Sequence, residues 1–204
     1  MKDQKITEFV DNLNSPAPTP GGGGASALAG ALSSALCGMV AHLTTGKKKY
    51  AEYQDEIDKI LEDTKVLCSQ MEDLIEEDAR AFAPLAEAYG IPKDAPDRDQ
   101  ILEKALINAA SAPYKIIETA GEIRDIVVRL ADIGSRLAIS DVGVAAALCS
   151  ATAKGAAMNI YINTKLMTDR EYAEKLNEDT RALVSGICAD CDKVYDRIKG
   201  DLKA

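Results

Sequence analysis

The chain has 204 residues, of which 47% are hydrophobic and only 4% aromatic, and it carries a formal net charge of −9 at pH 7. This length suits one sizeable core, so we expect a single domain over residues 1–204. An acidic surface repels phosphate groups, which argues against nucleic acid and anionic membranes as partners. Five scattered cysteines and an N-terminus without an apolar signal segment favour the reducing cytoplasm.

The first 44 residues predict two helices joined by a proline- and glycine-rich segment. Residues 3–13 place Ile6, Phe9 and Val10 on one helical face. Alternating prolines up to Pro20 then force an extended backbone, and four glycines follow. Residues 25–44 predict a nearly uncharged helix about as long as a membrane span. Because Ala, Gly and Ser predominate in it, we interpret it as a helix of a protein core.

The rest of the chain predicts four more helices and no strand. Apolar residues recur every three to four positions over 50–89, 97–132 and 169–202, and Pro84 and Pro113 are expected to kink the first two helices. Residues 141–167 predict a second small-residue helix. Long helices with short connections are typical of an all-α, up-and-down multi-helix bundle. We expect the two small-residue helices to pack closely at its centre, surrounded by the long charged helices.

The glycine run is the most informative local feature. A glycine run directly before a helix presents free backbone N–H groups at the positive end of the helix dipole, which suits an anion or a carbonyl. A flexible linker is the alternative. The close succession of prolines, glycines and an uncharged helix favours a binding site, formed by Pro20, Gly21, Gly22, Gly23 and Gly24.

Charged side chains near two helices are further candidates. Lys47 and Lys48 follow the first small-residue helix, where they either stabilise its C-terminal dipole or attract an anionic ligand. Asp78 lies beside the buried face of the helix over 50–89, where an acid is costly unless it is paired or catalytic. The residues alone favour a solvated acidic helix face there, with a general acid or base as the alternative.

The second small-residue helix carries polar residues with two interpretations each. Ser140 or Asp141 is expected to cap its N-terminus. Asn159 and Asn163 share one face, where they either recognise the polar edge of a heterocycle or bridge to another helix.

His42 is the only histidine, which rules out a histidine metal cluster, and it is expected to be a core or cap residue. The Cys-x-x-Cys pair at 188–191 stands alone, so reduced thiols and no metal site are expected.

Three stretches together resemble the cyclodeaminase/cyclohydrolase family, which includes formiminotetrahydrofolate cyclodeaminase and a bacterial methenyltetrahydrofolate cyclohydrolase. The first runs from the Pro-x-Pro-Gly-Gly-Gly segment at 18–23, through Met-Val and Leu-Thr at 39–40 and 43–44, to Gly-Lys-Lys-Lys-Tyr at 46–50. The second is Ala-Ile-Ser-Asp-Val-Gly-Val-Ala at 138–145, followed by Gly-Ala-Ala at 155–157 and Asn-Ile-Tyr-Ile-Asn at 159–163. A weaker third lies at 78–82. The resemblance covers almost the whole chain.

The resemblance implies an all-helical cytoplasmic homodimer with folate sites near the subunit interface. It implies a tetrahydrofolate derivative as substrate, with one glutamate or several in its tail, and neither a metal nor a cofactor besides that substrate. The expected activity is formiminotetrahydrofolate cyclodeamination, which gives methenyltetrahydrofolate and ammonia. Methenyltetrahydrofolate cyclohydrolysis is one alternative, and a non-catalytic folate-binding protein is another.

The resemblance also suggests roles for the candidate residues. Asp78 and Asp141 are the expected catalytic, proton-transferring residues. The substrate-binding residues are expected to be Pro20, Gly21, Gly22, Gly23, Gly24, Lys47, Lys48, Ser140, Asn159 and Asn163. One departure concerns Ser135, since family members often carry Asn after the glycine at this point. This difference bears on the choice of substrate.

Overall fold

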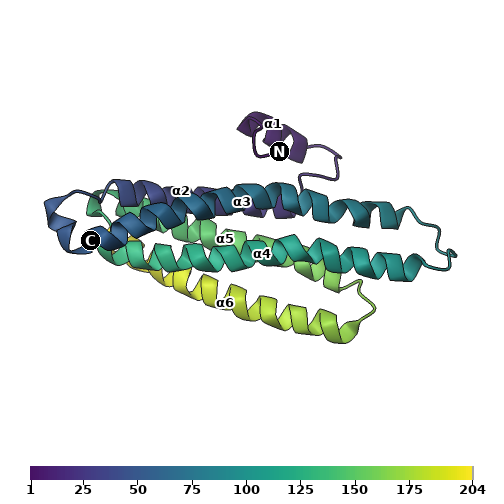
Figure 1. Cartoon of the computed structure of the whole chain (residues 1–204). Helices are drawn as coiled ribbons and strands as arrows, with labels where there is room; N and C mark the ends of the chain where they lie inside the picture. The colour runs from purple at the N-terminus through teal and green to yellow at the C-terminus, as the bar shows by residue number, and fades with distance from the viewer. Residues whose placement is uncertain (204) are drawn as a thin grey trace.

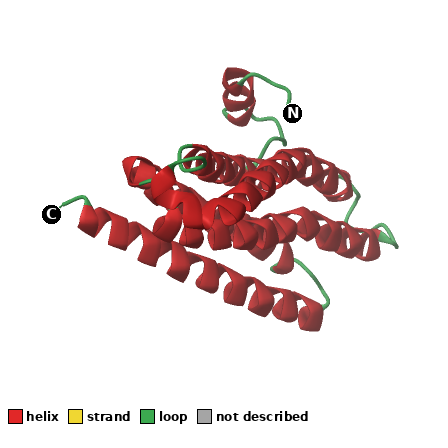
Figure 2. Ribbon diagram, turned by 60° about the vertical axis from the view of Figure 1, so that its left-hand side comes forward, coloured by secondary structure: helices red, strands yellow, loops and turns green. Residues whose placement is uncertain are grey.

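The computed structural model describes residues 1–203, and within them it contains six α-helices and no strand (Figures 1 and 2). The all-α bundle expected from the sequence is confirmed. The helices are α1 (Ile6–Leu13), α2 (Gly22–His42), α3 (Gln54–Tyr89), α4 (Arg98–Ile133), α5 (Ile139–Thr164) and α6 (Arg170–Asp201). Both α3 and α4 continue through their internal prolines, Pro84 and Pro113.

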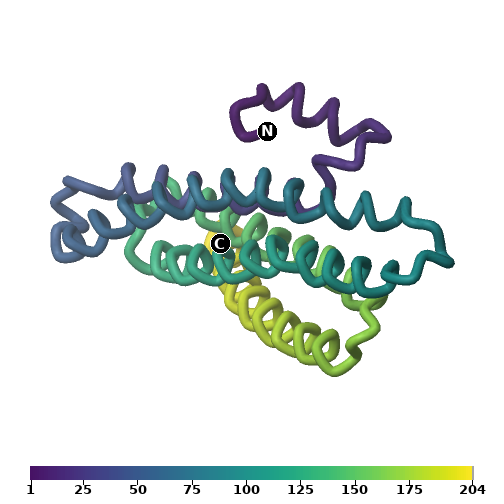
Figure 3. The backbone as a smooth tube through the Cα atoms, turned by 45° about the vertical axis from the view of Figure 1, so that its right-hand side comes forward, coloured from purple at the N-terminus to yellow at the C-terminus, as the bar shows by residue number. Residues whose placement is uncertain are grey.

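Helix α4 is the one that packs against four others, namely α2, α3, α5 and α6. Helices α2 and α5 lie side by side in one layer, and α3, α4 and α6 form the layer that covers them (Figures 1 and 3). The expectation that the two small-residue helices occupy the centre is therefore only half right. They pack closely on each other, but three long helices cover one of their sides and leave the other side open.

Small residues allow α2 and α5 to approach closely, and polar contacts fix their antiparallel register. The Ser33 hydroxyl on α2 donates to the Ala145 carbonyl on α5 at 2.8 Å. Near the other end of α2, a β-carbon added to Gly155 would overlap the Ser26 hydroxyl. The first turn of α5 therefore lies beside the last turns of α2, and the end of α5 lies beside the start of α2.

Two helix starts differ from the sequence predictions. Helix α2 begins at Gly22, so three of the four glycines form its first turn instead of a loop before it. The N-cap of α5 is Ala138, without a side-chain cap bond, so the prediction that Ser140 or Asp141 caps this helix is wrong. A 3₁₀-turn over Lys48–Tyr53 connects the end of α2 to α3. Lys47, the N-cap of this turn, contacts the Ser135 side chain between α4 and α5.

The uncovered side of α2 and α5 forms an apolar surface that we call the open face. On α2 its members recur at helical spacing, with Leu32 49% and Met39 39% exposed. On α5, Val144 is 50% and Met158 65% exposed. Both α2 and the segment Arg136–Thr164 are long and apolar enough to cross a membrane by length and composition, and 56% of each apolar window is buried within the protein. Core helices of soluble proteins have the same properties.

Helix α1 stands apart from the bundle and is held to α3 through the chain's first residues (Figure 1). The N-terminal amino group contacts Glu76 at 2.7 Å, and Lys2 contacts Asp73 at 2.5 Å. Phe9 is buried, whereas Ile6 is 75% exposed. Phe9 thus anchors one face of α1 against the core.

Gly186 offers a test of helix propensity in α6. It is exposed within the helix, and an added β-carbon would meet no atom within 4 Å. Because alanine loses less backbone entropy than glycine on folding, we expect Gly186→Ala to raise the free energy of unfolding by about 1 kcal/mol. Urea unfolding followed by circular dichroism measures this change. A decrease in stability would mean that α6 does not present this position to solvent.

Candidate functional site

The start of α2 and the late part of α3 form a first cluster, the glycine–aspartate cluster, made of Gly22, Gly23, Gly24, Asp78 and Asn159. The Gly24 N–H donates to the Asp78 carboxylate at 3.1 Å. A β-carbon on Gly23 would overlap the same carboxylate. The carboxylate therefore lies directly on the first turn of α2, at the positive end of the helix dipole. Glycine is required here so that the carboxylate can approach the backbone this closely.

Asp78 differs from Glu76 and Glu77, its two neighbours on α3, because its carboxylate contacts the backbone of α2. Glu76 binds the N-terminal amino group, and Glu77 pairs with Lys115 of α4. Burial raises the pKa of Asp78 above its usual range, and the Gly24 N–H opposes part of this rise. A carboxylate with a raised pKa is a stronger base than an ordinary one, and a positioned carboxylate can take and return a proton. The structure therefore contradicts a purely solvated acidic helix face at this position.

The two amides of α5 make the same kind of hydrogen bond but differ in what they border, since the Asn159 amide donates to the Gly155 carbonyl at 2.9 Å. A β-carbon on Gly22 would lie 3.1 Å from both polar atoms of the Asn159 side chain, so this amide borders the glycine–aspartate cluster. The Asn163 amide is buried and donates to the Asn159 carbonyl at 2.8 Å, one helical turn away. Pro20 is buried behind Gly24, 3.4 Å from an added β-carbon there. Asn159 is thus placed to meet a ligand, whereas the Asn163 amide is buried and bonded within its own helix.

The raised pKa of Asp78 predicts a pH dependence of stability. A raised folded-state pKa gives stability that is present below the unfolded pKa, about 3.9, and is lost as the pH rises through the folded value. Asp78→Asn cannot ionise and keeps an oxygen that accepts the Gly24 N–H. We therefore expect the stability of the variant relative to wild type to increase between pH 4 and pH 7, in urea unfolding at both pH values. A constant or shrinking difference would contradict the burial of this carboxylate.

A second cluster, the lysine–tyrosine cluster, lies at the other end of α2 and contains Lys47, Tyr50, Ser135 and Arg136. The Lys47 ammonium donates to the Ser135 hydroxyl at 3.2 Å, and the Ser135 N–H donates to the Thr44 hydroxyl at 2.8 Å. The Arg136 N–H donates to the Tyr50 phenol oxygen at 3.1 Å. This hydrogen bond, and then the nearby Lys49, lower the pKa of Tyr50.

Sequence reasoning did not assign Tyr50, Ser135 and Arg136 to a site. Tyr50 ends the Gly-Lys-Lys-Lys-Tyr stretch that carries the resemblance, and Ser135 is the position at which the resemblance leads us to expect Asn, so both positions had a signal. Lys48 lies in the 3₁₀-turn of the same region. Ser140 and Asp141 belong to the first turn of α5, which the antiparallel register also places at this end of the molecule.

The predicted site residues therefore divide between two ends of the bundle. Pro20, the four glycines, Asp78 and Asn159 surround the start of α2, whereas Lys47 and Lys48 follow its end. A helix of 21 residues is roughly 30 Å long. Asp78 and Asp141, the two expected catalytic residues, thus lie near opposite ends of α2, too far apart to act on the same atom within one chain.

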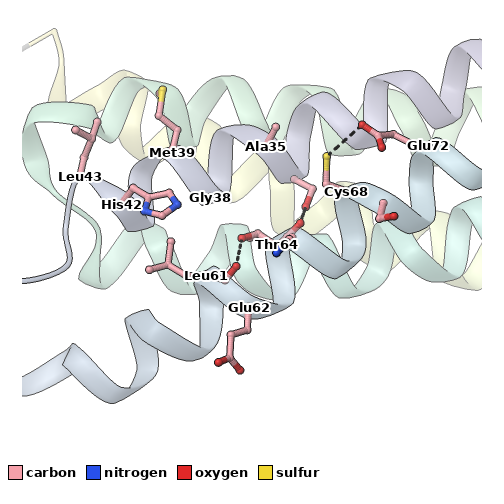
Figure 4. A pocket seen from close by; sticks show the side chains of 13 residues that line it. Ala35, Gly38, Met39, His42, Leu43, Leu61, Glu62, Thr64, Cys68 and Glu72 are labelled. Atoms are coloured by element: carbon pink, nitrogen blue, oxygen red, sulfur yellow. Dashed lines mark hydrogen bonds between the residues drawn. The ribbon is translucent and has the colours of Figure 1, made fainter. Parts of the chain in front are cut away.

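A groove of about 970 Å³ lies between the C-terminal half of α2 and α3. Figure 4 shows Met39, His42 and Leu43 of α2 opposite Leu61 and Thr64 of α3. His42 is exposed at the last position of α2, so it is not a core histidine. None of the predicted site residues lines this groove, which continues the open face toward α3.

Within residues 1–203, no group of three His, Cys, Asp or Glu side chains is arranged to hold a metal ion. The five cysteines are free thiols, and four of them are buried, including both members of the Cys188–Cys191 pair. What the two clusters offer is a half-buried carboxylate at a helix start and a set of cationic and hydroxyl donors. These groups suit proton transfer and the binding of an anionic ligand.

Known proteins are similar to this chain over nearly its whole length. The family model described as Formiminotransferase-cyclodeaminase matches residues 5–182. The methenyltetrahydrofolate cyclohydrolase of Methylorubrum extorquens is 35% identical, over 97% of both chains. The crystal structure of formiminotetrahydrofolate cyclodeaminase from Thermotoga maritima is 30% identical, with a TM-score of 0.85, over 97% of this chain and 98% of that one.

A longer relative is also similar. The formimidoyltransferase-cyclodeaminase of Mus musculus is 31% identical over 90% of this chain. The match covers 35% of that protein, so this chain spans about a third of its length. The part of the chain matched by the family model contains every residue of both clusters. The chain therefore belongs to the formiminotransferase-cyclodeaminase family.

Proposed function

We propose that this chain is a formiminotetrahydrofolate cyclodeaminase, which converts formiminotetrahydrofolate to methenyltetrahydrofolate and ammonia. The observation that carries the proposal is the Asp78 carboxylate, held on the first turn of α2 with a raised pKa. Its family relatives are enzymes named for these two folate reactions, a cyclodeaminase and a cyclohydrolase. A proton-transferring group in a glycine-lined site is what either reaction requires.

In the proposed reaction, the formimino group is bound in its protonated, cationic form, and N10 of the substrate attacks its carbon to form a tetrahedral centre bonded to N5, N10 and the amino group. The Asp78 carboxylate takes the proton that N10 loses and returns it to the departing amine, so ammonia leaves and the methenyl bridge remains. Because the carboxylate begins and ends ionised, the step needs no further reagent. The N–H groups of the first residues of α2 have no acceptor within the helix, so they are placed to hold polar atoms of the substrate.

Cyclohydrolysis is the second candidate, favoured by the 35% identical relative that matches over 97% of both chains. Here Asp78 would take a proton from the water that adds to the methenyl carbon, and ring opening would give formyltetrahydrofolate. Both reactions pass through a tetrahedral carbon between the same nitrogens, so one arrangement of groups serves either.

Two assays decide between these activities. Purified protein is mixed with formiminotetrahydrofolate, and methenyl absorbance and ammonia are followed together. In a second assay the loss of methenyltetrahydrofolate is compared with its spontaneous rate. Ammonia release supports the cyclodeaminase, and methenyl loss without activity on the formimino compound supports the cyclohydrolase. Turnover of neither substrate would overturn both proposals and favour a non-catalytic folate-binding protein.

We further propose that the protein works as a homodimer in the cytoplasm and uses no cofactor besides its folate substrate. The exposed apolar side chains of the open face support self-association. Free, mostly buried thiols suit a reducing compartment. Proton transfer is the only chemistry that the proposed reaction asks of the protein, and a net charge of −9 disfavours nucleic acid and anionic membranes as partners. The substrate tail carries one glutamate or several.

A further inference from the structure

Ser135 is a polar residue that the fold buries in the connection between α4 and α5, where it is 1% exposed. The connection lies closely against the end of α2, since a β-carbon added to the preceding Gly134 would come to 3.1 Å from the Val40 side chain. The Ser135 N–H donates to the Thr44 hydroxyl at 2.8 Å, and this buried hydroxyl donates to the Val40 carbonyl at 2.7 Å. The backbone of Ser135 is thus fixed to the end of α2.

The Ser135 hydroxyl holds the ammonium group of Lys47. The ammonium donates to it at 3.2 Å. Although the chain has 33 acidic residues, none of the ion pairs within residues 1–203 includes Lys47. A neutral partner fixes the ammonium without cancelling its charge, whereas a carboxylate would neutralise it. Because an ammonium has three N–H donors, two of them stay free for an anionic ligand.

The same connection also holds the phenol of Tyr50. The Arg136 N–H donates to the phenol oxygen at 3.1 Å, which leaves the phenol hydrogen free for a ligand oxygen. This hydrogen bond lowers the pKa of Tyr50, and the nearby Ser135 hydroxyl adds to the effect. The ammonium and the phenol therefore both present donors beside one buried hydroxyl. Donors of this kind, one of them charged, suit a carboxylate.

We propose that Ser135 is a positioning residue of the folate site, which holds the Lys47 ammonium beside the Tyr50 phenol so that both bind a carboxylate of the substrate's glutamate tail. This role rests on the folate reaction proposed above. An ammonium that is held in place before binding loses less freedom when the ligand arrives, so Ser135 raises affinity without taking part in the chemistry. The reacting carbon lies at Asp78, and the role of Ser135 is the same whichever subunit of the proposed homodimer supplies that aspartate.

The experiment compares the binding of two folates to the full chain by isothermal titration calorimetry. One is formyltetrahydrofolate, and the other is its pteroate analogue, which lacks the glutamate. For Ser135→Ala we expect the Kd of formyltetrahydrofolate to rise by about 3- to 10-fold, the cost of immobilising one long side chain on binding, and the Kd of the pteroate analogue to stay as in wild type. In turnover, KM of the glutamate-bearing substrate should rise by the same factor with kcat unchanged.

Two further variants show whether Ser135 acts through the ammonium. Lys47→Met removes the charge from an exposed side chain, so it should weaken formyltetrahydrofolate at least as much as Ser135→Ala does and leave the pteroate analogue unaffected. In the Lys47→Met background, Ser135→Ala should change neither Kd any further, because the group that it positions is absent.

A matched control separates the loss of a buried hydroxyl from the loss of binding. Ser33 is also a buried serine, its hydroxyl donates to the Ala145 carbonyl at 2.8 Å, and it belongs to neither cluster. We expect Ser33→Ala to lower the free energy of unfolding in urea while both Kd values stay as in wild type. Weaker folate binding in this variant would show that lost stability alone explains the effect of Ser135→Ala.

Three results would overturn the role assigned to Ser135. An unchanged Kd of formyltetrahydrofolate in Ser135→Ala would mean that Lys47 needs no support. An equal rise for both folates would mean that Ser135 maintains the shape of the protein and not a carboxylate contact. A further rise in the Lys47→Met background would mean that it acts on another group.

Failure of the proposed function gives a different result. Wild type that binds formyltetrahydrofolate but turns over neither substrate counts against the proposed reaction alone, because the Kd values are measured without turnover. Failure of wild type to bind either folate would overturn the folate substrate and the role of Ser135 together.

Discussion

Asp78→Asn is expected to lower kcat by about 10²–10⁴-fold, which is the usual contribution of a positioned acid or base. The amide has nearly the shape of the carboxylate and still accepts the Gly24 N–H, which the carboxylate accepts at 3.1 Å. The substrate pocket should therefore stay intact, with KM within a few-fold of wild type. Only proton transfer is lost, since an amide neither takes nor returns a proton at neutral pH. Steady-state kinetics on the substrate that wild type converts measures both constants.

A matched control lies one residue earlier on the same helix. Glu77→Gln removes the same charge but acts on a side chain that pairs with Lys115 and faces α4. We expect this variant to retain kcat within about twofold, because an exposed ion pair contributes little. A kcat of Asp78→Asn close to wild type would remove Asp78 from the chemistry. Equal losses in the two variants would point to the acidity of α3 in general instead of to one carboxylate.

The helices were predictable because their signals are local. Apolar spacing identified α3, α4 and α6 to within a few residues, and uncharged small-residue stretches identified α2 and α5. The layering was not predictable in the same way. Small residues show that a helix approaches something closely, but not whether it is covered on one side or on two. For this reason the sequence did not predict the open face of α2 and α5.

The two clusters depend on contacts that no local pattern contains. The Lys47 ammonium meets Ser135 across 88 positions, and Gly24 meets Asp78 across 54. The sequence marked Asp78 as lying beside a buried face, but its acidic neighbours gave the same pattern as a solvated helix surface. Only the fold separates them, by giving Glu76 and Glu77 their own cationic partners. The resemblance identified positions on both ends of α2 without showing that they lie far apart.

Gly23→Ala is expected to disable the site through a single added carbon. A β-carbon at this position overlaps the Asp78 carboxylate, so the carboxylate must leave the first turn of α2 and lose the Gly24 N–H. Alanine favours a helix over glycine by about 1 kcal/mol, whereas overpacking a closed contact costs about 1–3 kcal/mol. We therefore expect a net loss of stability and a fall in kcat/KM approaching that of Asp78→Asn. Urea unfolding and steady-state kinetics measure the two effects.

Removing the Asp78 carboxylate, the other partner of the overlap, tests directly why Gly23→Ala loses stability. In an Asp78→Ala background the space of the carboxylate is free, so Gly23→Ala should cost no stability there and should gain some from helix propensity. Turnover should stay absent in the double variant, because the proton-transferring group is gone. The same loss of stability in both backgrounds would show that Gly23 is constrained by something other than Asp78. Coupling between the two substitutions would instead show that glycine is present at this position to let the carboxylate rest on the helix.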